Sequence, residues 1–148
     1  MRVVLQRVNS ASVSIDGKEY SSIKLGYLLL VGIQDDDTEE ELDYLVRKIT
    51  NLRIFEDDQH KMNLNVKQVN GSILSVSQFT LYADTKHGNR PSFVKAGKPE
   101  YAEKLYNQFN DKLALSGIKV STGIFGDDMK VNIQNDGPCT IIFDTDNK

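Results

Sequence analysis

Residues Gly26 to Ile33 read GYLLLVGI, a run in which nearly every side chain is apolar. Such a run is typical of a buried β-strand. We therefore predict a strand enclosed within the protein. Further strands and helices predicted before and after this segment would pack against it.

Further strands and two helices are predicted around this segment. Two strands precede it, at Val3 to Val8 and Ala11 to Ile15, and Asp16-Gly17 is a hairpin turn signal. Shorter apolar runs predict strands later in the chain, at Arg53 to Phe55, Ser72 to Val76, Ile118 to Val120, Val131 to Ile133 and Thr140 to Phe143.

The two helices carry clear end signals. Thr38 and Glu41 form a capping-box pattern, and apolar residues then recur at helical spacing as far as Leu52. The second helix begins near Pro99, a favoured first helical residue, and ends by Gly117. Because no repeat, linker or low-complexity tract interrupts the chain, we predict one α+β domain over residues 1–148. In this domain the two helices pack on a mixed, largely antiparallel or barrel-like sheet.

Composition narrows the classes of protein. The 148 residues, 39% of them apolar, suffice for one buried core. The single cysteine, Cys139, excludes an internal disulfide framework and suits a reducing compartment. No apolar run approaches the ~20 residues needed to span a bilayer, and no signal peptide is evident at the start. We therefore expect a cytoplasmic protein that does not bind membranes.

The distribution of charge limits contact with nucleic acids. A net charge of −3 argues against the broad basic surface of a general DNA or RNA binder, so any RNA contact is local and DNA binding is not expected. The stretch Thr85 to Pro99, TKHGNRPSFVKAGKP, holds no carboxylate and carries Lys86, Arg90, Lys95 and Lys98. It is a candidate for phosphate contact, although an ordinary solvated loop has the same composition.

A polar group follows one of the predicted strands. In Ser77 to Asp84, SQFTLYAD, the large apolar residues Phe79 and Leu81 fall on the opposite parity from Leu74 and Val76. This change predicts either a bulge at Ser77-Gln78 or a strand buried on both faces, and a half-polar edge strand fits as well.

The chemistry open to these residues is limited. A serine or threonine hydroxyl is a poor nucleophile unless a base takes its proton, and the only imidazoles, His60 and His87, are not well placed by sequence. No cluster has metal-ligand spacing and no cofactor motif occurs, so we expect neither metal nor cofactor. Hydroxyls, an amide and backbone donors remain, which suit an ester that is already activated.

Several motifs together resemble the D-aminoacyl-tRNA deacylase family, over nearly the whole chain. They are Gln6-Arg7-Val8 with Ala11-Ser12-Val13, Lys61 to Asn65, Ser77-Gln78-Phe79-Thr80, Ala83-Asp84-Thr85, Gly88, Arg90-Pro91-Ser92-Phe93 and Asn135-Asp136-Gly137-Pro138-Cys139-Thr140. One position departs from the family, which usually has Val where Cys139 stands. We interpret Cys139 as a packing residue, not a nucleophile.

The resemblance implies an enzyme of translation quality control. Such an enzyme hydrolyses the ester between a D-amino acid and the terminal adenosine of tRNA, also removes mischarged glycine, and rejects L-aminoacyl-tRNA. The ribose 2′-hydroxyl lies beside the ester, so the substrate can assist its own cleavage. The resemblance further implies a homodimer in which each subunit contributes to its partner's pocket.

The resemblance also implies roles for residues of this chain. Ser77 and Gln78 shape the pocket, the backbone N–H of Phe79 binds the oxyanion or carbonyl, and Thr80 orients the amino acid or attacks it. A cis peptide at Gly137-Pro138, fixed with the help of Arg7, enters the partner's pocket and reads chirality. Lys86 and Arg90 are the candidate contacts to the acceptor end of tRNA.

Two other functions use the same residues. A serine or threonine acyl-enzyme hydrolase of small esters would use the hydroxyls of SQFT, and a non-catalytic module that binds RNA ends would use only the basic loop. An assay on matched D- and L-aminoacyl-tRNA separates these possibilities.

Overall fold

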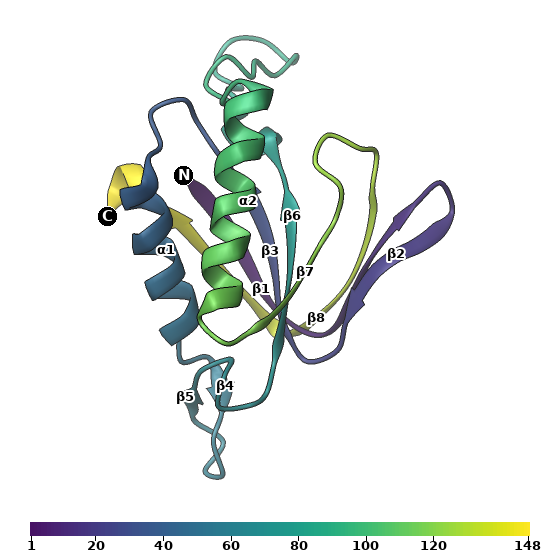
Figure 1. Ribbon diagram of the computed structural model, residues 1–148, viewed down its shortest axis with the longest axis vertical. Helices are drawn as coiled ribbons and strands as arrows, with labels where there is room; N and C mark the ends of the chain where they lie inside the picture. Colours follow the sequence, from purple (N-terminus) through teal and green to yellow (C-terminus); the bar gives the residue numbers. More distant parts are fainter.

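The structure is a computed structural model that describes residues 1–148, and it contains a large curved sheet with two helices beside it and a separate two-stranded sheet (Figure 1). No helix is both long and apolar enough to cross a membrane. The elements in chain order are β1 (Arg2–Ile15), β2 (Lys18–Ile23), β3 (Gly26–Gly32), α1 (Glu39–Asn51), β4 (Phe55–Glu56), β5 (Met62–Leu64), β6 (Ser72–Ser77), the 3-10 helix η1 (Phe79–Tyr82), α2 (Pro99–Leu115), β7 (Lys119–Thr122), β8 (Lys130–Asp144) and the 3-10 helix η2 (Thr145–Asn147).

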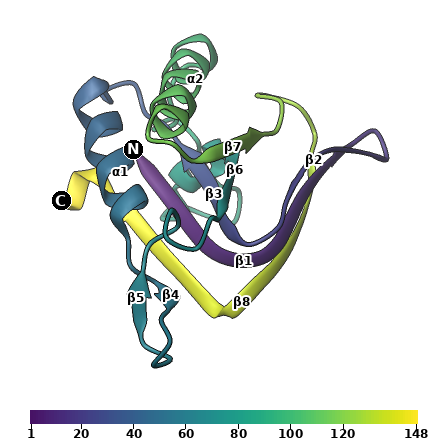
Figure 2. The ribbon, with the colours of Figure 1, turned by 60° about the horizontal axis from the view of Figure 1, so that its bottom comes forward.

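The main sheet is six-stranded and mixed. Its order is β2-β1-β3-β6-β7, and β8 pairs with β1. The β3–β6 and β6–β7 pairs are parallel, whereas β1 is antiparallel to β2, β3 and β8. The sheet curls (Figure 2), and the hydroxyl of Ser21 in β2 donates a 2.7 Å hydrogen bond to the carbonyl of Thr122 in β7. The sheet is therefore nearly closed, which confirms the predicted barrel-like α+β class.

Two pairs of predicted strands are in fact single strands. Val3 to Val8 and Ala11 to Ile15 both belong to β1, which pairs with β8 almost from end to end. Val131 to Ile133 and Thr140 to Phe143 likewise belong to β8. The predicted breaks are wrong because irregularities in the register, near Val8, absorb the polar residues without ending the ladder.

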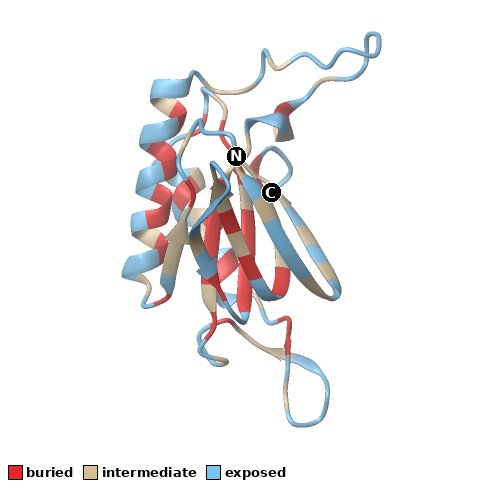
Figure 3. Ribbon diagram, turned by 90° about the vertical axis from the view of Figure 1, so that its right-hand side faces the viewer, coloured by how far each residue is buried: buried red, intermediate tan, exposed pale blue.

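The helices begin where the sequence predicts. Thr38 caps α1 with the full capping box, in which Glu41 accepts a 2.9 Å hydrogen bond from the Thr38 backbone, and Pro99 is the first residue of α2. Leu45, Phe109 and other apolar residues of the two helices pack against β1 and β3 in the main core. Figure 3 shows the resulting band of buried residues in the central strands. The sheet therefore supplies a rigid base for the segments at its edge.

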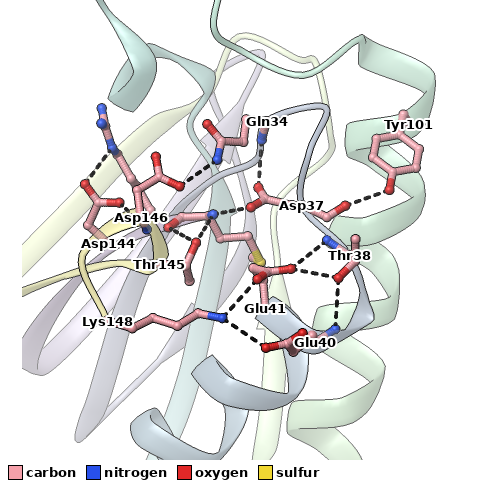
Figure 4. A network of polar contacts seen from close by, with 12 residues as sticks. Gln34, Asp37, Thr38, Glu40, Glu41, Tyr101, Asp144, Thr145, Asp146 and Lys148 are labelled. Atoms are coloured by element: carbon pink, nitrogen blue, oxygen red, sulfur yellow. Dashed lines mark hydrogen bonds and ion pairs between the residues drawn. The ribbon is translucent and has the colours of Figure 1, made fainter.

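A buried carboxylate links the start of both helices to the chain ends (Figure 4). Asp37 pairs with the amino group of Met1, accepts a 2.8 Å hydrogen bond from the backbone of Gln34, and its carbonyl accepts a 2.6 Å bond from the Tyr101 hydroxyl of α2. Burial raises the pKa of Asp37, although the hydrogen bonds from Gln34 and Met1 act in the opposite direction. In the same loop, the carboxylate of Asp35 accepts a 2.8 Å hydrogen bond from the backbone N–H of Lys98. This bond helps to fix the position at which α2 begins.

Candidate active site

A cavity of about 700 Å³ lies beside the ends of β3 and β6 and the beginning of α2. Its wall is mostly apolar. Besides β3, β6 and α2, the segment between β7 and β8 also contributes residues to this wall. The residues that form its apolar wall include Val31, Val76, Phe93, Tyr106, Phe125 and Met129. A cavity of this size encloses a ligand as large as an aminoacyl nucleoside.

Three of the residues predicted as site residues, Ser77, Gln78 and Phe79, line this cavity at the end of β6. The strand ends at Ser77, the backbone N–H of Gln78 donates a 2.7 Å hydrogen bond to the Val31 carbonyl, and η1 begins at Phe79. Of the predicted alternatives, the bulge at Ser77-Gln78 is therefore wrong and the strand buried on both faces is confirmed. The change of parity arises because the strand gives way to a 3-10 turn, while the strand itself, from Ile73 to Val76, is buried on both faces.

This turn supplies backbone donors at the cavity wall. The first N–H groups of any helix have no partner within the helix. Phe79 is the first residue of η1 and lines the cavity, so its N–H is free to donate to a ligand oxygen there. Such a donor suits the carbonyl oxygen of an ester, which gains negative charge as the ester is attacked.

Thr80 and the histidines are placed differently from the cavity residues. Thr80 is exposed and is not part of the lining, and its hydroxyl accepts a 2.5 Å hydrogen bond from the Gln78 amide. His60 lies against Glu56 at 3.3 Å and His87 is exposed, and neither lines the cavity. An imidazole base therefore does not meet either hydroxyl in this chain.

Among the residues that line the cavity, Tyr106 is buried and brings a phenol hydroxyl. The Tyr106 hydroxyl donates a 2.7 Å hydrogen bond to the Ser75 carbonyl, and burial raises the pKa of Tyr106. Charge is confined to the rim, where Lys98, Asp127 and Asp128 are exposed. No group of three or more His, Cys, Asp or Glu side chains is placed to hold a metal ion.

Gly137 and Pro138 lie in the middle of β8, outside the lining of the cavity of their own chain. Both are exposed, and the peptide bond between them is cis. Buried Arg7 holds the preceding residue, because its Nε lies 3.2 Å from the carboxylate of Asp136 and 3.3 Å from the Asp136 carbonyl. Cys139 is partly buried and packs against the main core.

The basic segment forms a loop after η1. Hydrogen bonds of 2.8 and 2.9 Å between the backbones of Asp84 and Ser92 close its base, and Lys86 and Arg90 are exposed between them, outside the cavity lining. The loop extends beyond the N-terminal end of α2 (Figure 1). The sequence prediction missed Phe125 and Met129; the only local signal for Phe125 is the pair of apolar residues between Gly123 and Gly126, and Met129 has none.

The model of the family D-Tyr-tRNA(Tyr) deacylase matches residues 4–144. The chain belongs to this family. A D-aminoacyl-tRNA deacylase from Limosilactobacillus reuteri (strain DSM 20016) is 65% identical to it over 144 residues, which cover 97% of this chain and 99% of that protein. The membership that the motifs predicted is thus confirmed over nearly the full length.

Solved structures agree with this deacylase family fold. The c-Myc DNA unwinding element binding protein is 43% identical, has a TM-score of 0.92, and is matched over 98% of this chain and 99% of that chain. A structure described as a probable eukaryotic D-amino acid tRNA deacylase is 19% identical with a TM-score of 0.83, over 96% of this chain and 97% of that one. The second likeness shows that the deacylase fold persists at low identity.

Proposed function

We propose that this deacylase family member hydrolyses the ester bond of D-aminoacyl-tRNA and releases the D-amino acid and free tRNA. One observation carries the proposal: Ser77, Gln78 and the Phe79 N–H meet at a cavity large enough for an aminoacyl nucleoside, in a chain 65% identical to a D-aminoacyl-tRNA deacylase. Its place of action is the cytoplasm, where aminoacyl-tRNAs supply the ribosome.

The reaction needs positioning and charge stabilisation more than a protein nucleophile. The Phe79 N–H donates to the ester carbonyl oxygen, where negative charge develops, while Ser77 and Gln78 hold the reacting group. Water adds its oxygen to the carbonyl carbon with the help of the neighbouring ribose 2′-hydroxyl. The bond from that carbon to the ribose oxygen then breaks, and the ribose oxygen takes up a proton.

Chirality is read by Gly137 and Pro138 of a second copy of the chain. Three features support this role: both residues are exposed, they lie outside their own cavity, and Arg7 fixes the strand beside them. A backbone segment placed close to the substrate's α-carbon would clash with an L side chain, and a D side chain would point away from it. Glycine has no side chain to exclude, so glycyl-tRNA is cleaved too.

The second copy binds along the free side of β8, and the active species is a homodimer. β8 pairs only with β1, and it leaves Ile142 72% exposed and Ile133 41% exposed. Exposed apolar side chains on an edge strand favour association with another chain. Light scattering should give twice the chain mass, and Ile142→Asp should lower that mass and the activity together.

Lys86 and Arg90 contact the acceptor end of the tRNA. They are exposed in a segment without carboxylates except at its base, and the loop that carries them extends from the cavity side of the molecule. An acidic protein with one short basic segment is expected to hold only a few phosphates.

A single set of assays tests the function. D-tyrosyl-, L-tyrosyl- and glycyl-tRNA are incubated with the protein, and the remaining ester is measured over time. We expect rapid loss of the D-tyrosyl and glycyl esters and persistence of the L-tyrosyl ester. Equal cleavage of both tyrosyl esters, or a covalent acyl-protein found by mass spectrometry, would support the acyl-enzyme alternative. Binding without any cleavage would support an RNA-end binding module.

A further inference from the structure

Two aromatic rings stand together at the mouth of the cavity. The rings of Phe79 and Phe93 lie 5.0 Å apart between centroids and are inclined at 72°, so the edge of one meets the face of the other. Both residues line the cavity, yet the Phe79 side chain is 58% exposed. A large aromatic ring left this open at a cavity mouth presents a flat apolar surface to a ligand.

The backbone around the pair holds the rings in place without a ligand. Phe79 opens η1 directly after β6, and Phe93 follows Ser92, whose backbone forms two hydrogen bonds with Asp84. The Phe93 carbonyl also accepts a 3.0 Å hydrogen bond from the Ala96 N–H. Since both ends of the loop are fixed, little conformational freedom is lost when a planar group stacks there.

The segment that carries Phe93 is basic, although the cavity rim also holds the carboxylates of Asp127 and Asp128. Lys86, Arg90, Lys95 and Lys98 are all exposed, and the stretch from Thr85 to Pro99 that contains Phe93 holds no carboxylate. Proteins that bind single-stranded nucleic acid combine cations for the phosphates with aromatic rings on which bases stack. The Phe79–Phe93 pair and these cations form such a combination.

We propose that the Phe79–Phe93 pair stacks on the nucleobase that immediately precedes the terminal adenosine of the tRNA. This inference rests on the proposed function and names a further part of its substrate. The cavity of about 700 Å³ has the size of a site for one aminoacyl nucleoside, so the preceding nucleotide lies outside it, at the mouth where Phe79 is exposed and Phe93 is partly exposed.

The test compares two small substrates that differ by one nucleotide. They are the D-tyrosyl esters of adenosine and of the dinucleotide cytidylyl-adenosine, in which the added base occupies the proposed stacking position. For the wild type we expect kcat/KM to be about tenfold higher with the dinucleotide, because stacking of one base on an aromatic side chain commonly changes affinity by about 5- to 150-fold.

Variants show whether the rings cause this preference. Phe93→Leu should lose the preference, so that the ratio of kcat/KM between the dinucleotide and adenosine esters falls from about ten to about one, whereas Phe93→Tyr should keep that ratio. Tyr20→Leu, which removes an aromatic residue 53% exposed on β2, is the matched control and should match the wild type. Circular dichroism checks that each variant is folded.

Three results would overturn the inference. In the first, the wild type cleaves both esters equally well, a comparison that needs no variant. In the second, Phe93→Leu slows both esters by the same factor, which means that the ring only shapes the cavity. In the third, Phe93→Leu keeps the dinucleotide preference. Cleavage of D-tyrosyl-tRNA together with any of these three results means that the inference alone fails, whereas no cleavage of D-tyrosyl-tRNA means that the proposed function fails.

Discussion

The side-chain amide of Gln78 donates a hydrogen bond of 2.5 Å to the hydroxyl oxygen of Thr80. Gln78 lines the cavity and Thr80 does not, so this bond joins a cavity residue to an exposed one. Neither histidine lies at the cavity to take the threonine proton. The geometry therefore favours a positioning role for the hydroxyl over a nucleophilic one.

We expect Thr80→Ala to slow deacylation of D-tyrosyl-tRNA by about 3- to 10-fold, since it removes one neutral hydrogen bond of about 1 kcal/mol. Ser77→Ala should likewise leave measurable activity. Initial rates with a radiolabelled D-amino acid measure both effects, and Ser22→Ala on β2 is the control for loss of an exposed hydroxyl. A Thr80→Ala protein that binds substrate normally and is inactive would instead identify the hydroxyl as the nucleophile.

Arg7 is predicted to support both stability and selectivity. Arg7→Met removes the contacts with Asp136 and a 2.6 Å hydrogen bond to the Ile54 carbonyl from a buried site. We expect unfolding free energy to fall by about 2–4 kcal/mol, as is common when a buried polar network is broken.

Arg7→Lys should be intermediate, because a single ammonium group cannot reach both partners with the geometry of a guanidinium. Urea unfolding measures the stability of each variant, and the ratio of D- to L-tyrosyl-tRNA cleavage measures its selectivity. Wild-type stability and selectivity in both variants would show that Arg7 does not position the Gly137–Pro138 segment.

Affinity for tRNA should depend only weakly on salt. With four cations in the basic segment, the logarithm of the binding constant is expected to fall with a slope of at most about −3 against the logarithm of salt concentration. Lys86→Ala and Arg90→Ala should each reduce that slope by about 0.7. Fluorescence titrations measure the slopes, and Lys24→Ala, between β2 and β3, should match the wild type. Unchanged affinity in both loop variants would remove the loop from the binding surface.

The capping box of α1 predicts a loss of stability in acid. Burial raises the pKa of Glu41, but hydrogen bonds from Thr38 and Lys148 outweigh it and lower that pKa from 4.5 to about 2. The folded state therefore prefers the ionised form, so the contribution of Glu41 is complete above pH 4.5 and is lost as pH falls toward 2.

Glu41→Gln should thus cost about 1 kcal/mol near pH 6, and its difference from the wild type should shrink by pH 3. Urea unfolding at several pH values measures both. Glu40→Gln, at an exposed neighbour, is the control and should show a smaller difference. If the difference in unfolding free energy between Glu41→Gln and the wild type is the same at pH 3 and pH 6, the lowered pKa of Glu41 is contradicted.

Local signals located the helices better than the strands. Thr38 and Pro99 mark helix starts through neighbours only a few residues away, so both starts were predictable. By contrast, β8 continues through Gly137-Pro138 because β1 pairs with it on both sides of that position. That support comes from residues more than 120 positions away, and no local pattern contains it.

The site was predictable only in the part that is contiguous in sequence. Ser77, Gln78 and Phe79 stand out as polar and aromatic residues at a strand end. Phe125 and Met129 reach the same cavity because β7 pairs with β6 and β8 pairs with β1, which brings the segment between β7 and β8 to the opposite wall. Their place depends on sheet closure and not on the residues beside them.

The Ser21–Thr122 hydrogen bond has a consequence for how the barrel moves. Between β2 and β7 this side-chain bond stands where neighbouring strands elsewhere share backbone ladders, so this seam is the weakest line in the wall. Directly after Thr122 the chain enters the segment that carries Phe125 and Met129 into the cavity. Fluctuations that separate β2 from β7 would first shift the segment between β7 and β8. We therefore expect the amide hydrogens of β7 to exchange with solvent faster than those of β3. Opening of the sheet between β2 and β7 and access to the cavity are thereby coupled through the segment that carries Phe125 and Met129.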